Sequence, residues 1–257
     1  MQKSAEVLSA ALHKGSISEE KFNAIVKKHS FVQESSDTIY LLLQAAGFPI
    51  IHDEGAKRYE LATKTMPVKK ARFCIVDLET NGGKPDRSQI IEIGAVMVQE
   101  GRIIDTFESL VHCSYLPKFV TKITGIDMDS LKNAPKLKKV LSEFKQFLGD
   151  AVFVAHNVDF DYKFLSKSFK RFGLGEIANR KVCTIELAKK TIPSQKYGLS
   201  HLNEKLHLQN DARHRALGDA KATAKLLEII MKNLPKEVKT VEDLLDFAKH
   251  GKKVYTT

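Results

Sequence analysis

Residues 73–83, FCIVDLETNGG, join an apolar run to two acidic side chains, Asp77 and Glu79. The apolar run is typical of a buried β-strand. Residues i and i+2 of a strand face the same side, so both carboxylates point the same way at its carboxyl end. Burial of even one unpaired carboxylate is costly, so the pair requires a neutralising partner. We therefore predict that Asp77 and Glu79 form a chelating pair at the end of a core strand.

The sequence around this strand has an α/β pattern. Three successive strands are predicted over 72–79, 89–99 and 102–112, and QEGR forms the turn between the last two. Consecutive strands joined by short turns indicate an antiparallel meander. The later strands alternate with helices, which adds them by crossover connections. The predicted fold is a mixed five-stranded sheet flanked by helices, with helices over 117–148, a strand over 151–156, a helix over 158–172, a short strand over 181–184, and helices to 234.

A second acidic segment is AHNVDFDYKFL, residues 155–165, in which a predicted buried strand runs into a helix. Asn157 and Asp161 are four residues apart, and this spacing places both on one side of a helix. Asp159 points elsewhere and is interpreted as a carboxylate that stabilises the start of the helix.

The third segment is ARHRALGDAKATAKLL, residues 212–227, whose apolar spacing predicts a helix packed on the sheet. His214 precedes Asp219 by five residues, which separates them by about 140° on a regular helix. Both side chains can face one site only if His214 lies on the preceding loop or on a frayed first turn. We predict a fixed Asp219 and a mobile His214.

Each motif is weak alone, but the three together, in this order, are specific. The sequence resembles the DEDDh 3′ to 5′ exonucleases of the ribonuclease H-like fold through DLET, HNVDFD and HRALGD. The resemblance covers about residues 70–234 and includes IIEIGAV, ITGI and YGLSHL, which are most similar to the proofreading epsilon subunits of bacterial DNA polymerase III. Asn81 follows Thr80 where these proteins more often have a second threonine. We expect this difference to alter packing near the terminal nucleotide rather than metal binding.

The resemblance implies a two-metal mechanism. By analogy, Asp77 bridges two divalent cations, Mg²⁺ or Mn²⁺. Glu79 and Asp219 complete the tighter site, and Asp161 holds the second ion through water. Oxygen ligands of this kind favour these hard cations on chemical grounds as well. Imidazole groups titrate near neutral pH, and His214 is the predicted acceptor of the proton from the attacking water.

The predicted reaction is hydrolysis of the terminal phosphodiester at a DNA 3′ end, releasing nucleoside 5′-monophosphates, as in replication proofreading or repair. Single-stranded, frayed or mismatched primer-template ends are the expected substrates, because an unpaired nucleotide enters a pocket at lower cost. Thr80 and Asn157 are candidate substrate contacts, although plain polar packing explains them nearly as well. The alternatives are a DEDDh exoribonuclease that trims RNA ends, a non-catalytic nucleic-acid-binding module and a structural protein.

The charge distribution favours a polyanionic partner. Residues 1–70 carry ten basic and eight acidic side chains, so about +8 of the formal net charge of +10 belongs to residues 71–257. Such an excess of basic side chains fits nucleic acid binding, although surface lysines also serve solubility.

Residues 1–66 are predicted to form a small winged-helix-like domain, with helices over 4–13, 18–29 and 36–47 followed by a hairpin. The third helix contains no Arg or Lys, the donors that groove reading usually needs. A protein-docking role is therefore preferred over DNA binding, with the replicative polymerase or another protein as the partner. The predicted exonuclease domain spans 67–235, and a C-terminal helical tail spans 236–257.

The remaining features concern the environment of the protein. Cys74, Cys113 and Cys183 are far apart and lack C-x-x-C spacing, so neither a disulfide framework nor a zinc site is predicted. No apolar run is long enough to cross a bilayer, and no membrane partner is expected. We expect a cytoplasmic protein.

Overall fold

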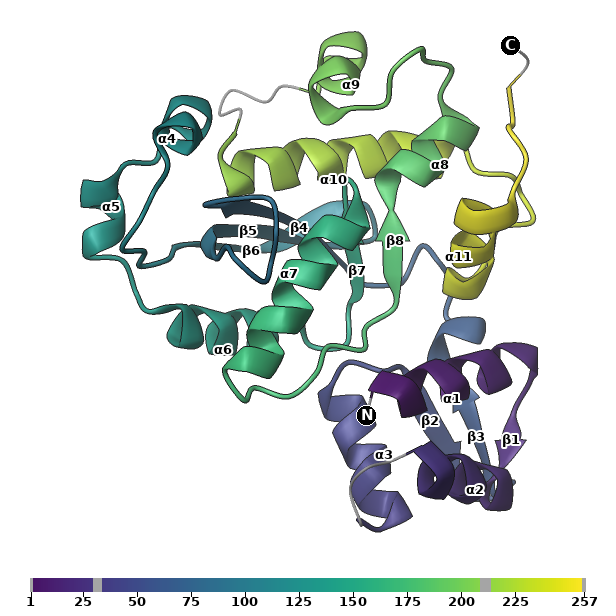
Figure 1. The fold of residues 1–257 in the computed structure, drawn as a ribbon. Coiled ribbons are helices and arrows are strands. Elements are labelled where there is room, and N and C mark those ends of the chain that lie inside the picture. Colours follow the sequence, from purple (N-terminus) through teal and green to yellow (C-terminus); the bar gives the residue numbers. More distant parts are fainter. Residues whose placement is uncertain (1, 30–33, 209–213, 256–257) are drawn as a thin grey trace.

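The computed structural model describes residues 2–29, 34–208 and 214–255, and its central element is a five-stranded mixed sheet (Figure 1). The strand order is β6-β5-β4-β7-β8. The first three strands form the predicted antiparallel meander, whereas β7 and β8 run parallel to β4. The strand bounds are β4 (Phe73–Thr80), β5 (Ile90–Gln99), β6 (Arg102–Leu110), β7 (Val152–Ala155) and β8 (Lys181–Cys183).

Helices cover both faces of this sheet, so β4 and β5 are buried on both sides (Figure 1). Alternate residues of β4 enter opposite cores: Ile75 packs with α8, α9, α10 and α11, and Val76 packs with α6 and α7. The helix bounds are α6 (Leu137–Leu148), α7 (Val158–Arg171), α8 (Thr184–Thr191), α9 (Leu199–Leu206), α10 (Ala216–Lys232) and α11 (Val241–His250). The predicted α/β class and five-stranded sheet are confirmed.

Two short helices, α4 (Lys118–Thr124) and α5 (Met128–Lys132), pack at the start of β5. Their small apolar core includes Ile91 of β5, Val120 of α4 and Leu131 of α5. Because β5 is antiparallel to β4, the start of β5 lies beside the carboxyl end of β4.

The described residues of the N-terminal part, 2–29 and 34–64, form three helices and a three-stranded antiparallel sheet of order β1-β3-β2. The three predicted helices and the hairpin are present, and β1 is an additional strand. Its two residues are too few to give a periodic pattern in the sequence. The bounds are α1 (Gln2–Lys14), β1 (Ile17–Ser18), α2 (Glu19–His29), α3 (Ser36–Ala45), β2 (Ile50–Asp53), β3 (Arg58–Leu61) and a 3₁₀ turn, η1 (Ala62–Lys64).

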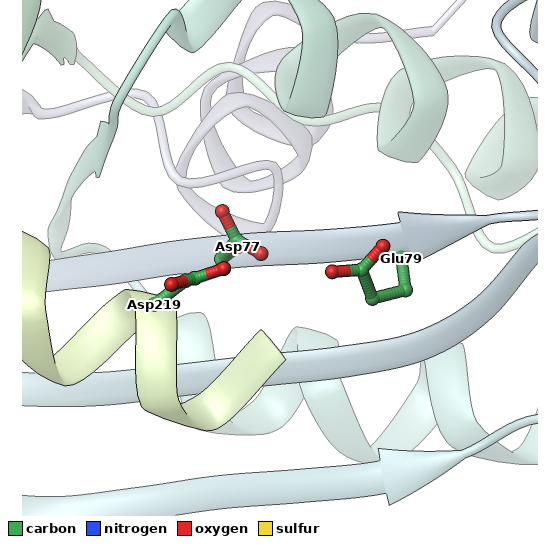
Figure 2. Close-up of side chains that lie close together, drawn as sticks. All are labelled: Asp77, Glu79 and Asp219. Carbon is green, nitrogen blue, oxygen red and sulfur yellow. The ribbon is translucent and has the colours of Figure 1, made fainter. Parts of the chain in front are cut away.

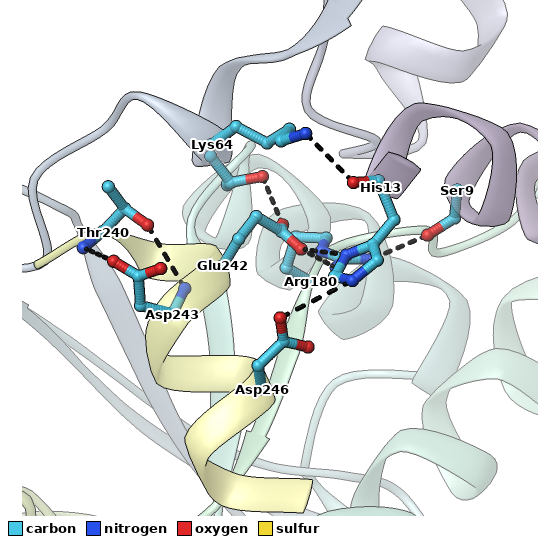
Figure 3. A network of polar contacts seen from close by, with 9 residues as sticks. Ser9, His13, Lys64, Arg180, Thr240, Glu242, Asp243 and Asp246 are labelled. Carbon is cyan, nitrogen blue, oxygen red and sulfur yellow. Dashed lines mark hydrogen bonds and ion pairs between the residues drawn. The ribbon is translucent and has the colours of Figure 1, made fainter. Parts of the chain in front are cut away.

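The N-terminal elements contact the rest of the chain through a polar network (Figure 3). At its centre, the buried carboxylate of Glu242 on α11 accepts hydrogen bonds from Arg180 and from the Thr63 hydroxyl, the latter at 2.6 Å. Arg180 also donates to Ser9 of α1 at 2.8 Å. His13 of α1 lies 3.5 Å from the Glu242 carboxylate. The network therefore joins α1, η1, α11 and the residue preceding β8.

The predicted C-terminal helix is present as α11, and a capping box between Thr240 and Asp243 starts it. Its apolar side chains, including Val241, Leu244 and Phe247, belong to the same core as α8 and α10. In the described ranges, no helix has the length and apolar character needed to span a membrane.

Candidate active site

Asp77 and Glu79 lie on one face of β4 and, with Asp219 of α10, form a carboxylate cluster (Figure 2). One carboxylate oxygen from each residue lies within 4.8 Å of the other two. The cluster contains oxygen donors only, which is the ligand chemistry of hard divalent cations. The three residues are therefore a candidate metal centre.

A glycine opposite Asp77 allows α10 to bring Asp219 to the cluster. Gly94 of β5 is the cross-strand partner of Asp77. A Cβ atom on Gly94 would overlap the backbone of Ala216 and Leu217 at the start of α10. The absence of a side chain lets the first turn of α10 rest on the sheet, which positions Asp219 beside the strand.

A buried ion pair holds the same helix end. Glu92, the cross-strand partner of Glu79, is fully buried. Its carboxylate accepts hydrogen bonds from Arg215 Nε at 3.0 Å and from a terminal nitrogen of the same guanidinium at 2.6 Å. It also accepts the backbone N–H of Ala216 at 2.9 Å, which satisfies one of the free N–H groups of the helix start. Glu92 therefore anchors α10 to β5.

Asp161 of α7 is buried at the same pocket but lies outside the three-carboxylate cluster. Its Oδ1 accepts the backbone N–H of Leu78 at 3.1 Å, which fixes the carboxylate against β4. Asn157, in the left-handed conformation with φ of 78°, precedes α7 and also lines the pocket. Asp159 lies in the first turn of α7, as predicted, and does not line this pocket; its carboxylate pairs with Lys181 at 2.7 Å.

These acids line a pocket of about 270 Å³. Its other walls come from α7 and α9, which contribute Phe160, Leu199, Ser200 and Asn203 among the lining residues. His156 also lines the pocket, but both of its ring nitrogens are engaged, by Thr184 Oγ1 at 2.9 Å and the Tyr197 carbonyl at 2.8 Å. Burial lowers the pKa of His156. This histidine therefore positions the segment before α9 rather than exchanging protons.

His214 is exposed in the turn before α10, with a positive φ of 60°. It is one of the residues that line the pocket, and its backbone N–H donates to Asp219 Oδ2 at 3.2 Å. This non-helical position lets His214 and Asp219 face one pocket despite their five-residue spacing. Residues 209–213, which precede it, lie outside the described residues.

The carboxylates in the pocket disfavour one another's ionisation. Burial raises the pKa of Asp77 well above its ordinary value, and the charges of Asp161, Asp219, Glu79 and Glu92 raise it further. Burial, followed by the charge of Asp219, raises the pKa of Glu79 to about 8. Burial likewise raises the pKa of Asp161 to about 8. A bound cation would reverse these shifts, because it favours the ionised form of its ligands.

The structure also places the two residues that follow Glu79. The Thr80 hydroxyl donates to the Gly82 carbonyl at 2.9 Å, and its role in substrate binding stays a prediction. The Asn81 side chain accepts the Gln89 N–H at 2.8 Å and donates to the Tyr115 carbonyl at 3.1 Å. Asn81 therefore holds the loop before α4 against the end of β4.

The mixed five-stranded sheet and the acidic cluster on its central strand together define an α/β protein with a candidate metal centre. The chain belongs to the RNase_T family of exonucleases, whose family model matches residues 74–227.

Several curated proteins are similar to the chain over this region. The DNA polymerase III subunit epsilon of Aquifex aeolicus is 36% identical over 164 residues, which cover 63% of this chain and 81% of that protein. A PolC-type DNA polymerase III of Halalkalibacterium halodurans is 38% identical over 73% of this chain. The 3′-5′ exonuclease DinG of Staphylococcus epidermidis is 38% identical over 61% of it. The chain spans only 13% of that polymerase and 18% of that DinG protein.

Solved structures share the fold. Exonuclease X in complex with 5′ overhanging duplex DNA superposes with a TM-score of 0.54 at 28% identity, covering 68% of this chain and 99% of that one. Escherichia coli exonuclease I in complex with a dA16 oligonucleotide gives a TM-score of 0.60, covering 69% of this chain and 43% of that one. At 16% identity the second comparison supports the fold alone.

Proposed function

We propose that this protein is a metal-dependent 3′ to 5′ exonuclease that releases nucleoside 5′-monophosphates from DNA ends. The single observation that carries the proposal is the convergence of Asp77, Glu79 and Asp219 within 4.8 Å, in a pocket that Asp161 and His214 also line. The names of the similar proteins support it, because they include a polymerase III epsilon subunit and a 3′-5′ exonuclease.

The donor set fits a pair of divalent cations, Mg²⁺ or Mn²⁺. Asp77, Glu79 and Asp219 would hold one cation, and Asp77 with Asp161 would hold the other. When bound, two such ions neutralise the acids and stabilise both the attacking and the leaving oxygen of a displacement at phosphorus. The buried Asp161 carboxylate already accepts the Leu78 N–H, so it reaches toward the pocket in a fixed orientation.

His214 is the proposed general base. The turn before α10 places His214 at the pocket, and this residue is exposed to solvent. In this role the imidazole accepts the proton of the attacking water and carries it to solvent. Asp219, which accepts the His214 backbone N–H, links the position of the base to the acidic cluster.

We propose that the pocket beside the acids, which α7 and α9 help to line, receives one terminal nucleotide. An unpaired 3′ end enters it at lower cost than a paired one, because less stacking and pairing are lost. We therefore propose single-stranded, frayed or mismatched DNA 3′ ends as substrates. Asn157, which immediately precedes α7 and lines the pocket, is a proposed substrate contact.

The proposal is tested by a time course on 5′-labelled matched and mismatched primer-templates, beside an RNA oligomer of the same sequence, with Mg²⁺ present. We expect stepwise shortening from the 3′ end, faster on the mismatched primer. EDTA should stop cleavage, and added Mg²⁺ or Mn²⁺ should restore it. Preference for the RNA would identify an exoribonuclease. No shortening of any labelled strand with either cation would leave a non-catalytic binding module and would refute the proposal.

For the N-terminal residues we propose a winged-helix-like domain over 1–66 that docks a protein, such as a replicative polymerase. The element order α1-β1-α2-α3-β2-β3 supports this assignment. The absence of Arg and Lys from α3 supports docking rather than groove reading. The proposed exonuclease domain spans 67–235 and is followed by the C-terminal helical segment 236–257.

A further inference from the structure

Residues 251–255 follow α11 and return along α8, and none of them lines the carboxylate pocket. The Val254 N–H donates to the Lys190 carbonyl at 2.9 Å, and the Tyr255 hydroxyl donates to the Lys189 carbonyl at 2.9 Å. Both carbonyls belong to the last turn of α8, where a helix leaves its carbonyl groups free. Figure 1 shows this segment in yellow beside α8. We call residues 251–255 the α8 strap.

Tyr255 connects the strap to the loop between α8 and α9, residues 192–198. Its hydroxyl lies 2.9 Å from the hydroxyl of Tyr197 in this loop. The Tyr197 hydroxyl also donates to the Ile192 carbonyl at 3.0 Å. The two hydroxyls have one hydrogen each for these contacts and the Lys189 carbonyl, so each depends on the other for its orientation.

The backbone of Tyr197 continues this connection to the pocket. Its carbonyl lies 2.8 Å from His156 Nε2, and a carbonyl only accepts, so Nε2 carries the ring proton. In the neutral ring Nδ1 then accepts the Thr184 hydroxyl at 2.9 Å. His156 lines the pocket, and so do Leu199 and Asn203 of α9, which begins two residues after Tyr197. Tyr197 therefore joins two parts of the pocket wall.

The acids are held by different contacts. The ion pair between Glu92 and Arg215 fixes the start of α10 against β5. Tyr197, in contrast, packs against the core that α8, α10 and α11 share, and the strap reaches it from outside that core. A change at Tyr255 should therefore shift the wall formed by His156 and α9 while the acidic cluster stays in place.

We propose that Tyr255 is a positioning residue: through Tyr197 it holds His156 and the start of α9 in the arrangement that receives the terminal nucleotide. This inference rests on the proposed exonuclease function. Small displacements of a wall that orients a substrate have large effects, even when the altered residue lies far from the chemistry. The strap thus contributes to substrate binding although it never touches the substrate.

The test compares steady-state cleavage of oligothymidine, with Mg²⁺, by the full-length parent and by Tyr255→Phe, which loses only the hydroxyl. KM should rise about three- to tenfold, the range expected for one lost hydrogen bond, while kcat stays near the parent value. Tyr197→Phe should raise KM by at least this factor. Adding Tyr255→Phe to it should raise KM little further, because both substitutions remove the same contact.

Tyr40→Phe is the matched control. The Tyr40 hydroxyl accepts a hydrogen bond from Gln44 at 2.9 Å within α3, and Tyr40 does not line the pocket, so KM should stay at the parent value. A parent-like KM in Tyr255→Phe would overturn the proposal. A fall in kcat at constant KM would overturn it as well, because a general loss of folded protein produces that pattern.

A second measurement separates this inference from the proposed function. In ¹⁵N-labelled protein, NMR follows the exchange of the His156 Nε2–H with water, which requires opening of its bond to the Tyr197 carbonyl. This exchange should be faster in Tyr255→Phe, while the backbone amides of β5 keep the parent rate. If the parent protein cleaves neither DNA nor RNA, the exonuclease function fails, and faster exchange still shows that Tyr255 positions His156. Equal exchange rates would overturn the positioning role itself.

Discussion

The carboxylate of Glu92 and the guanidinium of Arg215 form a hydrogen-bonded ion pair that joins β5 to the start of α10. Glu92 is fully buried, whereas Arg215 is partly open to solvent. Glu92 is the cross-strand partner of Glu79, and Arg215 immediately precedes α10, the helix that carries Asp219. The pair therefore holds the start of α10 against the strands that carry Glu79.

Glu92→Gln should lower both stability and turnover. The neutral amide loses the charge-assisted bonds to Arg215, a loss of about 1.5–3 kcal/mol in unfolding free energy, with the value reduced by the exposure of Arg215. Thermal unfolding and kcat on oligothymidine are the measurements. Glu228→Gln, which breaks an exposed pair with Lys232 on the same helix, is the control and should leave both nearly unchanged. Wild-type kcat in Glu92→Gln would contradict a positioning role.

Asp77→Asn should greatly slow cleavage and make the metal-free protein more stable. The carboxamide cannot neutralise a cation, so we expect a loss of about a thousandfold in kcat, the scale of removing one group that stabilises transition-state charge. It also removes a buried acid that Asp161, Asp219 and Glu79 repel. The melting temperature in EDTA should therefore rise. A fall in melting temperature would show that Asp77 supports the fold through contacts other than these charges.

The stability of the metal-free protein should fall as pH rises from about 5 to 8. The folded-state pKa of Glu79 is about 8 against an ordinary value of 4.5, so the folded state holds a proton that the unfolded state has already released. The contribution of Glu79 to folding stability is fully present below its unfolded-state pKa. This contribution is lost as the pH rises toward the folded-state pKa. Asp161, with a pKa of about 8, acts in the same direction.

Melting curves in EDTA across this range check the prediction, and Mg²⁺ should raise the melting temperature more at about pH 8 than at pH 5, because it competes with protons. Glu79→Gln should flatten the profile in EDTA. Equal melting temperatures at both ends of the range for the parent protein would be incompatible with the raised pKa values.

Gly94→Ala should displace α10. The added methyl group meets the backbone of Ala216 and Leu217, which has no flexible end that can move aside. Overpacking of this kind costs about 1–3 kcal/mol, and the shift should reduce kcat by moving Asp219. Gly15→Ala is the control, since nothing lies within 4 Å of the added atom. Full activity with normal stability in Gly94→Ala would show that α10 tolerates a wider separation.

His214→Ala should slow cleavage without preventing metal binding. Loss of a general base typically reduces the rate about 10²–10⁴-fold. The ring is exposed and outside the three-carboxylate cluster, so the stabilisation by Mn²⁺ in thermal unfolding should persist. His207→Ala, an exposed histidine at the end of α9 that does not line the pocket, should retain the parent rate. Loss of Mn²⁺ stabilisation in His214→Ala would assign this residue to metal binding instead.

Much of this architecture was predictable from local pattern. Strands β4, β5 and β7 were predictable because each is a run of buried apolar residues. Helix α10 was predictable because its apolar residues recur at helical spacing and form one buried face. The common face of Asp77 and Glu79 follows from the two-residue repeat of a strand, and their place near its end follows from the apolar run before them. The five-residue separation of His214 and Asp219 likewise required a non-helical His214, and the structure has one.

The supporting residues were not predictable in the same way, because their roles depend on contacts across long sequence separations. Glu92 interrupts the run IIEIGAV, and a charge inside a buried strand indicates a cationic partner, although the sequence does not identify Arg215 as that partner. His156 and the residues of α9 give no such signal, since the pocket wall they form exists only after the chain has closed on β4. The β1 strand and the polar network around Glu242 also arise only from tertiary packing.

That network has a practical consequence for anyone who shortens the chain. The carboxylate of Glu242 is buried by partners that come from both sides of residue 66, namely Thr63 and Arg180. A minimal catalytic fragment that starts at Met66 keeps the guanidinium but loses the hydroxyl, and it opens the side of α11 that η1 covers. A shortened protein should therefore also carry a substitution at Glu242, because this carboxylate would lose a hydrogen-bond partner. The newly exposed side of α11 would otherwise favour aggregation or proteolysis.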